Sequence, residues 1–215
     1  MPKHLDSRTR HNLVLLALSV IFIFVIGLFT QLADMSEVYF TFMSLIIVVS
    51  VFTIRRKGAA WLYLPIALVI LTWIAELLKL SALSTISGVL AMAFFFIVVV
   101  MLVIRVASSR EVGLREFLES INVYLLLGIA ASILFFIVYR LDPDAYNYPG
   151  ESPSGRFDFI YYSFVTMTTL GYGDITPISP VARMLSIFFS VAGQLYLTMI
   201  IALLVGKYLS QRNDE

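Results

Sequence analysis

Residues 166–174 read Thr-Met-Thr-Thr-Leu-Gly-Tyr-Gly-Asp, and an apolar run flanks them on each side. Within this stretch Gly171 and Gly173 alternate with residues that carry side chains. Glycine adopts positive φ at little cost, which other residues do not. An ordinary strand points successive carbonyls to opposite sides, whereas positive φ at alternate residues lets several of them face the same way. The spacing therefore predicts a short segment, residues 169–173, whose main-chain oxygens line one axis.

This segment resembles the selectivity filter of the tetrameric potassium-channel family. Its five residues are Thr169, Leu170, Gly171, Tyr172 and Gly173. The family signature is Thr-Val-Gly-Tyr-Gly, so Leu170 stands in place of a valine. The departure is mild, because the carbonyl of that residue and not its side chain would face the ion. The preceding Thr-Met-Thr and the following Asp174 extend the resemblance.

The resemblance implies a K⁺ site made of backbone carbonyls. A K⁺ ion that enters a narrow pore loses its water, so protein oxygens must replace the hydration shell. The expected ligands are the carbonyls of Thr169, Leu170, Gly171 and Tyr172. Asp174 would lie at the outer mouth, where a negative charge concentrates cations. A ring of carbonyls needs four such loops, so we expect a homotetramer with K⁺ as the permeant ion and no cofactor.

The composition indicates an integral membrane protein. Of the 215 residues, 60% are hydrophobic and 13% are charged, against about 45–50% and 25% in soluble domains. The net charge of +1 does not favour nucleic-acid binding. The chain has no cysteine, and the apolar runs hold no histidine and no paired carboxylates of the kind that a membrane enzyme would need. A transporter is not favoured either, because the one short re-entrant segment, which ends in residues 169–173, has no second copy in the chain, whereas transporters are built from internal repeats.

Six apolar runs are long enough to be membrane spans at 1.5 Å per residue. We expect an all-α fold in which a four-helix bundle resembling a voltage sensor precedes a two-helix pore module with a re-entrant pore helix. The runs are 13–30, 38–54, 59–80, 86–106, 121–139 and 181–206. The expected parts are an N-terminus at 1–12, the bundle at 13–106, a linker at 107–120, the pore domain at 121–208 and a tail at 209–215. Within the pore domain we expect an outer helix at 121–140, a turret at 141–156, a pore helix at 157–168, the filter at 169–173 and an inner helix at 180–208.

The positive charges predict the orientation. Lys and Arg concentrate in alternate short loops, which places both termini in the cytoplasm. We expect a multi-pass protein of the cell membrane, and the compact chain suggests a prokaryote. The fourth span, Ile86–Ile104, contains no charge, and voltage sensing needs several charges within the field. Strong voltage sensing is therefore not expected. Glu76 and Lys79 lie three residues apart and are interpreted as an interfacial pair on one helix face, with a buried functional pair as the alternative.

The linker carries an amphipathic pattern. Ser108 with Glu111 matches a capping box. Leu114, Phe117, Leu118 and Ile121 share one helix face, as in a helix that lies on the membrane surface. Charged residues, including Glu119, occupy the remaining positions. The family resemblance implies that Leu114 and Phe117 couple the bundle to the pore, and a passive linker is the alternative.

Four residues of the pore helix are candidates for support of the filter: Tyr161, Tyr162, Val165 and Thr168. Tyr161 and Tyr162 stand where many relatives carry two tryptophans that brace the filter tyrosine. Their phenols could donate hydrogen bonds to Asp174, and interfacial anchoring is the alternative. Val165 replaces a glutamate of some relatives. The prolines and glycines of the turret predict an exposed segment without helix or sheet.

The inner helix carries a second group of candidates. Ser179-Pro180 predicts its cap and first position. Gly193 is either a hinge or a site of close helix packing. Gln194, Thr198 and Ile201 share one face and either line a water-filled cavity or make contacts between helices. The sequence thus predicts passive, K⁺-selective conduction, with a weakly selective cation pore and a non-conducting assembly subunit as alternatives.

Overall fold

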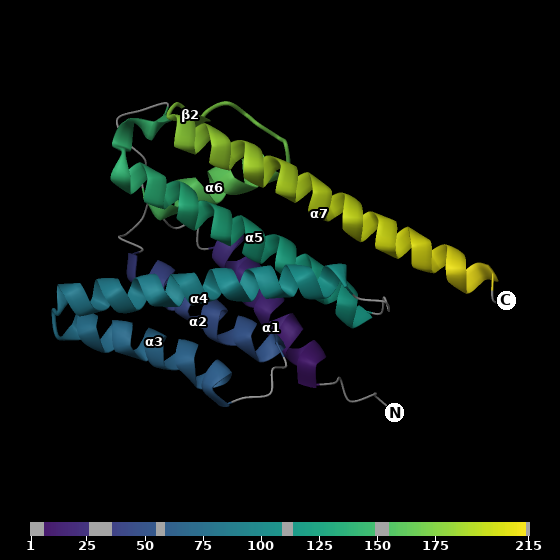
Figure 1. Cartoon of the computed structure of the whole chain (residues 1–215), viewed down its shortest axis with the longest axis horizontal. Coiled ribbons are helices and arrows are strands. Elements are labelled where there is room, and N and C mark those ends of the chain that lie inside the picture. The colour runs from purple at the N-terminus through teal and green to yellow at the C-terminus, as the bar shows by residue number, and fades with distance from the viewer. Residues whose placement is uncertain (1–6, 26–35, 55–58, 109–113, 149–154, 214–215) are drawn as a thin grey trace. The chain divides into compact units, whose positions relative to one another are not determined.

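A computed structural model describes residues 7–25, 36–54, 59–108, 114–148 and 155–213 of the chain. Helices make up most of the described chain (Figure 1), and the expected all-α membrane fold is confirmed. Contacts divide the chain into two units. Unit 1 groups the described residues up to 108 with residues 114–122, and unit 2 groups those from 123 onwards. The expected partner of Ser108, Glu111, lies outside the described residues.

Unit 1 contains four apolar helices. They are α1 (Ser7–Val20), which continues as the π-helical turn η1 (Ile21–Val25), α2 (Ser36–Thr53), α3 (Ala59–Leu77) and α4 (Ser81–Ala107). Within the unit, α1 packs mainly on α2, and α3 packs mainly on α4 (Figure 1). Their side chains form an apolar core because each helix is apolar over most of its length.

Helix α4 begins five residues earlier than the sequence predicts. The expected loop at 81–85 is helical, and the hydroxyl of Thr85 donates to the carbonyl of Ser81 (2.8 Å) within the first turn. The connection from α3 to α4 is consequently a tight turn, with Lys79 at φ 56°. Since α3 ends at Leu77, the expected shared helix face of Glu76 and Lys79 is wrong. Their position at a membrane interface stays a prediction.

Three helices of the described chain are long and apolar enough to cross a membrane. They are Ser81–Ala107, Arg115–Leu141 and Pro180–Ala202. Three shorter apolar helices cover Thr9–Val25, Glu37–Thr53 and Tyr63–Leu77. Each of these six segments falls within or close to one of the six apolar runs.

Helix α5 (Leu114–Leu141) is continuous. The sequence places a boundary between a linker helix and an outer helix at residue 121, and the structure has no break there. The first turns of α5 belong to unit 1, and its residues from Val123 onwards belong to unit 2. Nothing in the local sequence interrupts the helix, because residues 114–141 contain no proline and only one glycine, Gly128.

Unit 2 adds two further helices to α5. They are the short helix α6 (Arg156–Met167) and the long helix α7 (Pro180–Asn213). The Ser179 hydroxyl accepts a hydrogen bond from the amide N–H of Ala182 (3.2 Å), so the expected cap of α7 is confirmed. Helices α6 and α7 contact each other (Figure 1).

The expectation for the turret is wrong over part of its length. A 3₁₀ turn, η3 (Pro143–Ala145), leads into strand β1 (Tyr146–Asn147). This strand pairs antiparallel with β2 (Thr176–Pro177), so that Tyr146 faces Pro177. The amide N–H of Ile178 extends the contact by donating to the Ala145 carbonyl (2.8 Å). The two-residue strand forms because β2 supplies partners that the local sequence does not reveal.

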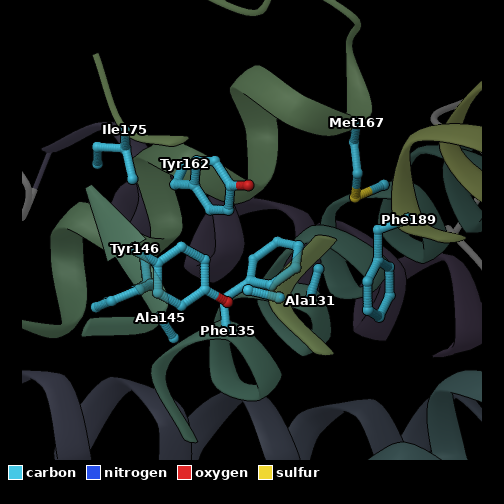
Figure 2. Close-up of a cluster of buried hydrophobic side chains, with 10 residues drawn as sticks. Ala131, Phe135, Ala145, Tyr146, Tyr162, Met167, Ile175 and Phe189 are labelled. Carbon is cyan, nitrogen blue, oxygen red and sulfur yellow. The ribbon is translucent and has the colours of Figure 1, made fainter. Parts of the chain in front are cut away.

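The core of unit 2 is aromatic and lies where α5, α6 and α7 meet (Figure 2). Phe135 of α5 has its ring centroid 4.9 Å from that of Tyr162 of α6 and 5.6 Å from that of Phe189 of α7. Tyr146 of β1 completes the group, 5.6 Å from Tyr162. Because Ala145 and Tyr146 are buried in this core, this part of the turret is not exposed as predicted.

Candidate functional site

The segment 169–173 begins where α6 ends, and main-chain hydrogen bonds fix the way it leaves the helix. The amide N–H of Thr169 donates to the Thr166 carbonyl (3.1 Å), and that of Leu170 donates to the Val165 carbonyl (3.0 Å). These two bonds form the Schellman motif, in which the residue after the helix cap adopts the left-handed conformation. The amide of Gly171 also donates to the Val165 carbonyl (3.2 Å). The carbonyl of Val165 therefore ties the filter segment to α6.

Positive φ recurs at every second residue of the segment. Thr169 has φ 59°, Gly171 has φ 58° and Gly173 has φ 80°. The two glycines adopt this conformation without strain. Thr169 is β-branched, and the left-handed region costs such a residue about 1–2 kcal/mol. The Schellman motif supplies the hydrogen bonds that hold Thr169 there.

This alternation is the backbone geometry that the sequence predicts from its glycines. Positive φ also occurs at Thr169, where the glycine spacing does not predict it. The side chains of Leu170 and Tyr172, which lie between them, are 54% and 68% exposed. In the single chain these two side chains are therefore largely uncovered by other residues.

Tyr161 and Asp174 are brought together at the C-terminal end of the segment. The Tyr161 hydroxyl donates to Asp174 Oδ2 (2.5 Å), and the amide N–H of Ile175 donates to Oδ1 of the same carboxylate (3.0 Å). The hydrogen bond from Tyr161 is the main cause that lowers the pKa of Asp174, and it raises the pKa of Tyr161 to about 12. Both shifts favour an ionised Asp174 beside a neutral phenol.

Tyr162 lies in the aromatic core with Phe135 and Tyr146 (Figure 2). Its hydroxyl lies 2.7 Å from the Ser186 hydroxyl on α7. Ser186 donates its own proton to the Ala182 carbonyl (2.7 Å), so Tyr162 is the donor to Ser186. The two adjacent tyrosines thus have different partners, and only Tyr161 contacts Asp174 in the way the sequence suggests.

Thr168 and Val165 support the end of α6. The Thr168 hydroxyl donates to the Phe164 carbonyl (2.6 Å) and completes the last turn. The side chain of Val165 is buried, and its contribution to the filter segment comes from its carbonyl.

Gly193 lies where α7 passes the end of α6. A Cβ atom built on Gly193 would be 2.7 Å from the Met167 carbonyl oxygen and 3.2 Å from its Cα. Real Cβ atoms essentially never show a distance below 3.0 Å, so the two helices approach too closely for any side chain. Helix α7 continues through residue 193 without a break.

Comparisons with known proteins bear on the same region. A family model described as "Ion channel" matches residues 123–210. This part of the chain is similar to an ion-channel family. The match begins at Val123, which is also where unit 2 begins within α5.

Three relatives illustrate the similarity. Two-pore potassium channel 2 of Arabidopsis thaliana is 39% identical over 86 residues, which is 40% of this chain and 17% of the relative. A voltage-gated potassium channel of Aeropyrum pernix is 27% identical over 100 residues, 46% of this chain and 34% of the relative. Potassium voltage-gated channel subfamily A member 7 of Homo sapiens is 28% identical over 102 residues, 47% of this chain and 20% of the relative.

The chain thus spans 17 to 34% of the length of these relatives. No solved structure gives a significant match. The resemblance to potassium channels that the filter residues carry is confirmed, because all three relatives bear that description.

The remaining candidates within residues 123–210 lie on α7. Gln194, Thr198 and Ile201 are all exposed in the single chain. The Thr198 hydroxyl donates to the Gln194 carbonyl (2.8 Å), so its oxygen remains available as an acceptor. Of the linker candidates, Phe117 is 39% exposed, and the side chain of Leu114 lies outside the described residues.

Sequence reasoning missed several residues of the site. Gly128 of α5 faces the ring of Phe164, whose nearest atom lies 2.4 Å from a built Cβ. Ser186 gives no local signal either, because a serine in an apolar helix predicts no particular partner. Glu119 was placed among the solvated charges of an amphipathic helix, and its side chain is only 4% exposed. A contact partner distant in the sequence explains each of these differences.

Proposed function

We propose that the chain is one subunit of a homotetrameric, potassium-selective channel that conducts K⁺ passively. The observation that carries this proposal is the recurrence of positive φ at Thr169, Gly171 and Gly173, directly after the short helix α6. That geometry suits a row of carbonyl oxygens that replaces the water around K⁺. The names of the relatives, all potassium channels, support the choice of ion.

The exposed surface of residues 123–210 supports a tetramer. One chain supplies oxygens on one side of an ion, and a closed ring needs four. Helix α7 leaves a row of large apolar side chains uncovered, namely Val181, Met184, Ile187, Phe188, Val191 and Leu195. Apart from the adjacent Ile187 and Phe188, they are spaced three to four residues apart, which places them on one face of the helix. We propose that α7 and the filter segment face the equivalent parts of the other three subunits.

Further parts of the proposal concern the path of the ion. Gln194, Thr198 and Ile201 line the cavity below Thr169, and Asp174 draws cations to the outer mouth. Both termini lie in the cytoplasm of a prokaryotic cell. Leu114 and Phe117 transmit changes of the bundle to the pore, and alanine at both positions is expected to alter the open probability. Strong voltage dependence is not expected, because α4 has no charge before Arg105.

Purified protein in planar bilayers, with K⁺ and Na⁺ on opposite sides, tests the proposal. We expect a reversal potential near that of K⁺ and an open probability that changes little with the voltage. Gly171→Ala places a Cβ at φ 58°, which costs about 1–2 kcal/mol in each subunit, and is expected to abolish selectivity. Equal permeability of K⁺ and Na⁺ in the parent would indicate a weakly selective pore, and absence of current would indicate an assembly subunit. Either result refutes the proposal.

A further inference from the structure

A buried carboxylate lies near the start of α5, within unit 1. Glu119 is 4% exposed, and its Oε1 atom lies 3.2 Å from Arg105 Nη2 of α4. The same oxygen accepts hydrogen bonds from Arg115 Nε (3.3 Å), one turn earlier on α5, and from Asn12 Nδ2 of α1 (3.3 Å). A carboxylate removed from water in this way is costly unless it is paired. Here two cations and one amide converge on it.

The contacts around Glu119 continue into two more helix ends. Arg105 Nη1 donates to the carbonyl of Thr53 (2.9 Å), the last residue of α2. A cation at a helix C-terminus satisfies a carbonyl that has no partner within the helix. Asn122 Nδ2 donates to the carbonyl of Asn12 (2.8 Å), and both asparagines are 1% exposed. The cluster therefore connects α1, α2 and α4 to the first turns of α5.

Helix α5 gives this cluster a mechanical significance. Its residues 114–122 group with the bundle, and Val123 is the first residue both of unit 2 and of the family match. The helix has no break between the two parts. One continuous helix therefore joins the cluster to the residues that the family model matches.

The charge content of α4 leads to the same residues. Arg105 is the only charged residue between Ser81 and Ala107. It is therefore the group of α4 on which another charge can act most strongly, and it is paired with Glu119. This ion pair therefore joins the C-terminal end of α4 to the start of α5.

We propose that Glu119 is the positioning residue through which α1, α2 and α4 hold the start of α5, so that its ion pair with Arg105 sets the open probability of the channel. A buried ion pair is weak as a source of stability, because desolvation offsets much of the attraction. Its value here is geometric. Separation of Glu119 from Arg105 would leave a buried charge with one partner fewer, so the start of α5 is restricted to positions that keep the pair.

The test rests on the proposed channel function and compares the parent with four variants in K⁺ bilayers. The parent is recorded beside Glu119→Gln, Arg105→Gln and the double variant. Glu76→Gln is the matched control, because Glu76 is an exposed carboxylate of the same unit. Open probability and the reversal potential between K⁺ and Na⁺ are measured for each, and size-exclusion chromatography reports assembly.

We expect Glu119→Gln and Arg105→Gln each to change the open probability by about tenfold, equivalent to about 1.4 kcal/mol. The double variant should change it no more than the larger single change, because both substitutions remove the same interaction. The reversal potential should stay at the parent value in every variant. Glu76→Gln should stay within about twofold of the parent, the range expected of an independent site.

Two results overturn the role of Glu119 while leaving the channel intact. One is an unchanged open probability in Glu119→Gln, and the other is additive effects of the two single substitutions. If Glu119→Gln does not assemble, Arg105→Gln decides by itself, because it leaves Glu119 paired with Arg115, and an open probability equal to that of the parent refutes the proposal. A parent that passes no K⁺ overturns the channel function itself, which is a distinguishable outcome.

Discussion

Substitution of Gly193 by alanine distinguishes close packing from a hinge. Ordinary contact begins near 3.4 Å, and a Cβ at Gly193 would lie 2.7 Å from the Met167 carbonyl oxygen. The end of α6 and helix α7 would have to separate by about 0.7 Å. Met167 is fully buried, so its surroundings do not yield easily. Overpacking of this kind costs about 1–3 kcal/mol, which equals or exceeds the roughly 1 kcal/mol that alanine adds to helix stability over glycine.

Gly88 of α4 supplies the matched control. A Cβ at Gly88 would meet its nearest neighbour, Thr72 Cγ2, at 3.9 Å, which is ordinary contact. Gly88→Ala should therefore stabilise the protein by up to about 1 kcal/mol. Gly193→Ala should destabilise it by up to about 2 kcal/mol per subunit, once the gain in helix propensity is subtracted from the cost of overpacking.

Thermal unfolding of the purified protein in detergent measures both changes, and bilayer recordings measure selectivity. Gly193→Ala should also reduce the preference for K⁺ over Na⁺, because Met167 lies two residues before Thr169 and any shift of its carbonyl is passed to the filter. A variant as stable and as selective as Gly88→Ala would refute the packing argument. An altered open probability with unchanged stability and selectivity would favour the hinge.

The tyrosines of α6 give three further predictions. The hydrogen bond between Tyr161 and Asp174 should persist between about pH 5 and pH 10. The lowered pKa of Asp174 keeps its carboxylate ionised to a lower pH, and the pKa of Tyr161 of about 12 keeps its phenol neutral to a higher pH. Conductance recorded across that range checks this, and a titration near pH 7 would contradict it. Tyr161→Phe should return the pKa of Asp174 towards its ordinary value. During acid titration the K⁺ conductance of this variant should therefore fall at a higher pH than that of the parent. Coincident titration curves of variant and parent would count against the hydrogen bond. Tyr162→Phe should lower the free energy of unfolding by about 1 kcal/mol per subunit through loss of its hydrogen bond to Ser186. The double variant with Ser186→Ala should be destabilised by less than the sum of the two single changes. Strict additivity in thermal unfolding would exclude the contact.

The positive φ of Gly171 and Gly173 could be predicted from the sequence because its requirements are local. Gly171 and Gly173 are there to allow positive φ, and no distant contact is needed to infer it. The alternating backbone at these residues follows from that property alone. The six apolar runs are equally local, since their length and composition set where a helix can lie in a membrane.

Thr169 shows where local reasoning ends. Its side chain disfavours positive φ, and no sequence rule assigns that conformation to it. The hydrogen bonds of Thr169 and Leu170 to the last turn of α6 impose it. For a similar reason the sequence does not distinguish a hinge at Gly193 from close helix packing, since it does not show that Met167 lies against this glycine.

Glu119 is the clearest case of a residue whose burial is determined by the tertiary structure and not by the local sequence. Its position in an amphipathic pattern favours solvent, and its partner Asn12 lies 107 residues earlier in the chain. Burial of the carboxylate is tolerable only because Arg105, Arg115 and Asn12 reach it together. Backbone conformations that one residue type permits, and spans that composition permits, are properties of short stretches and can be inferred from them. Whether a charge is buried depends on which other groups surround it, and only the folded chain determines that.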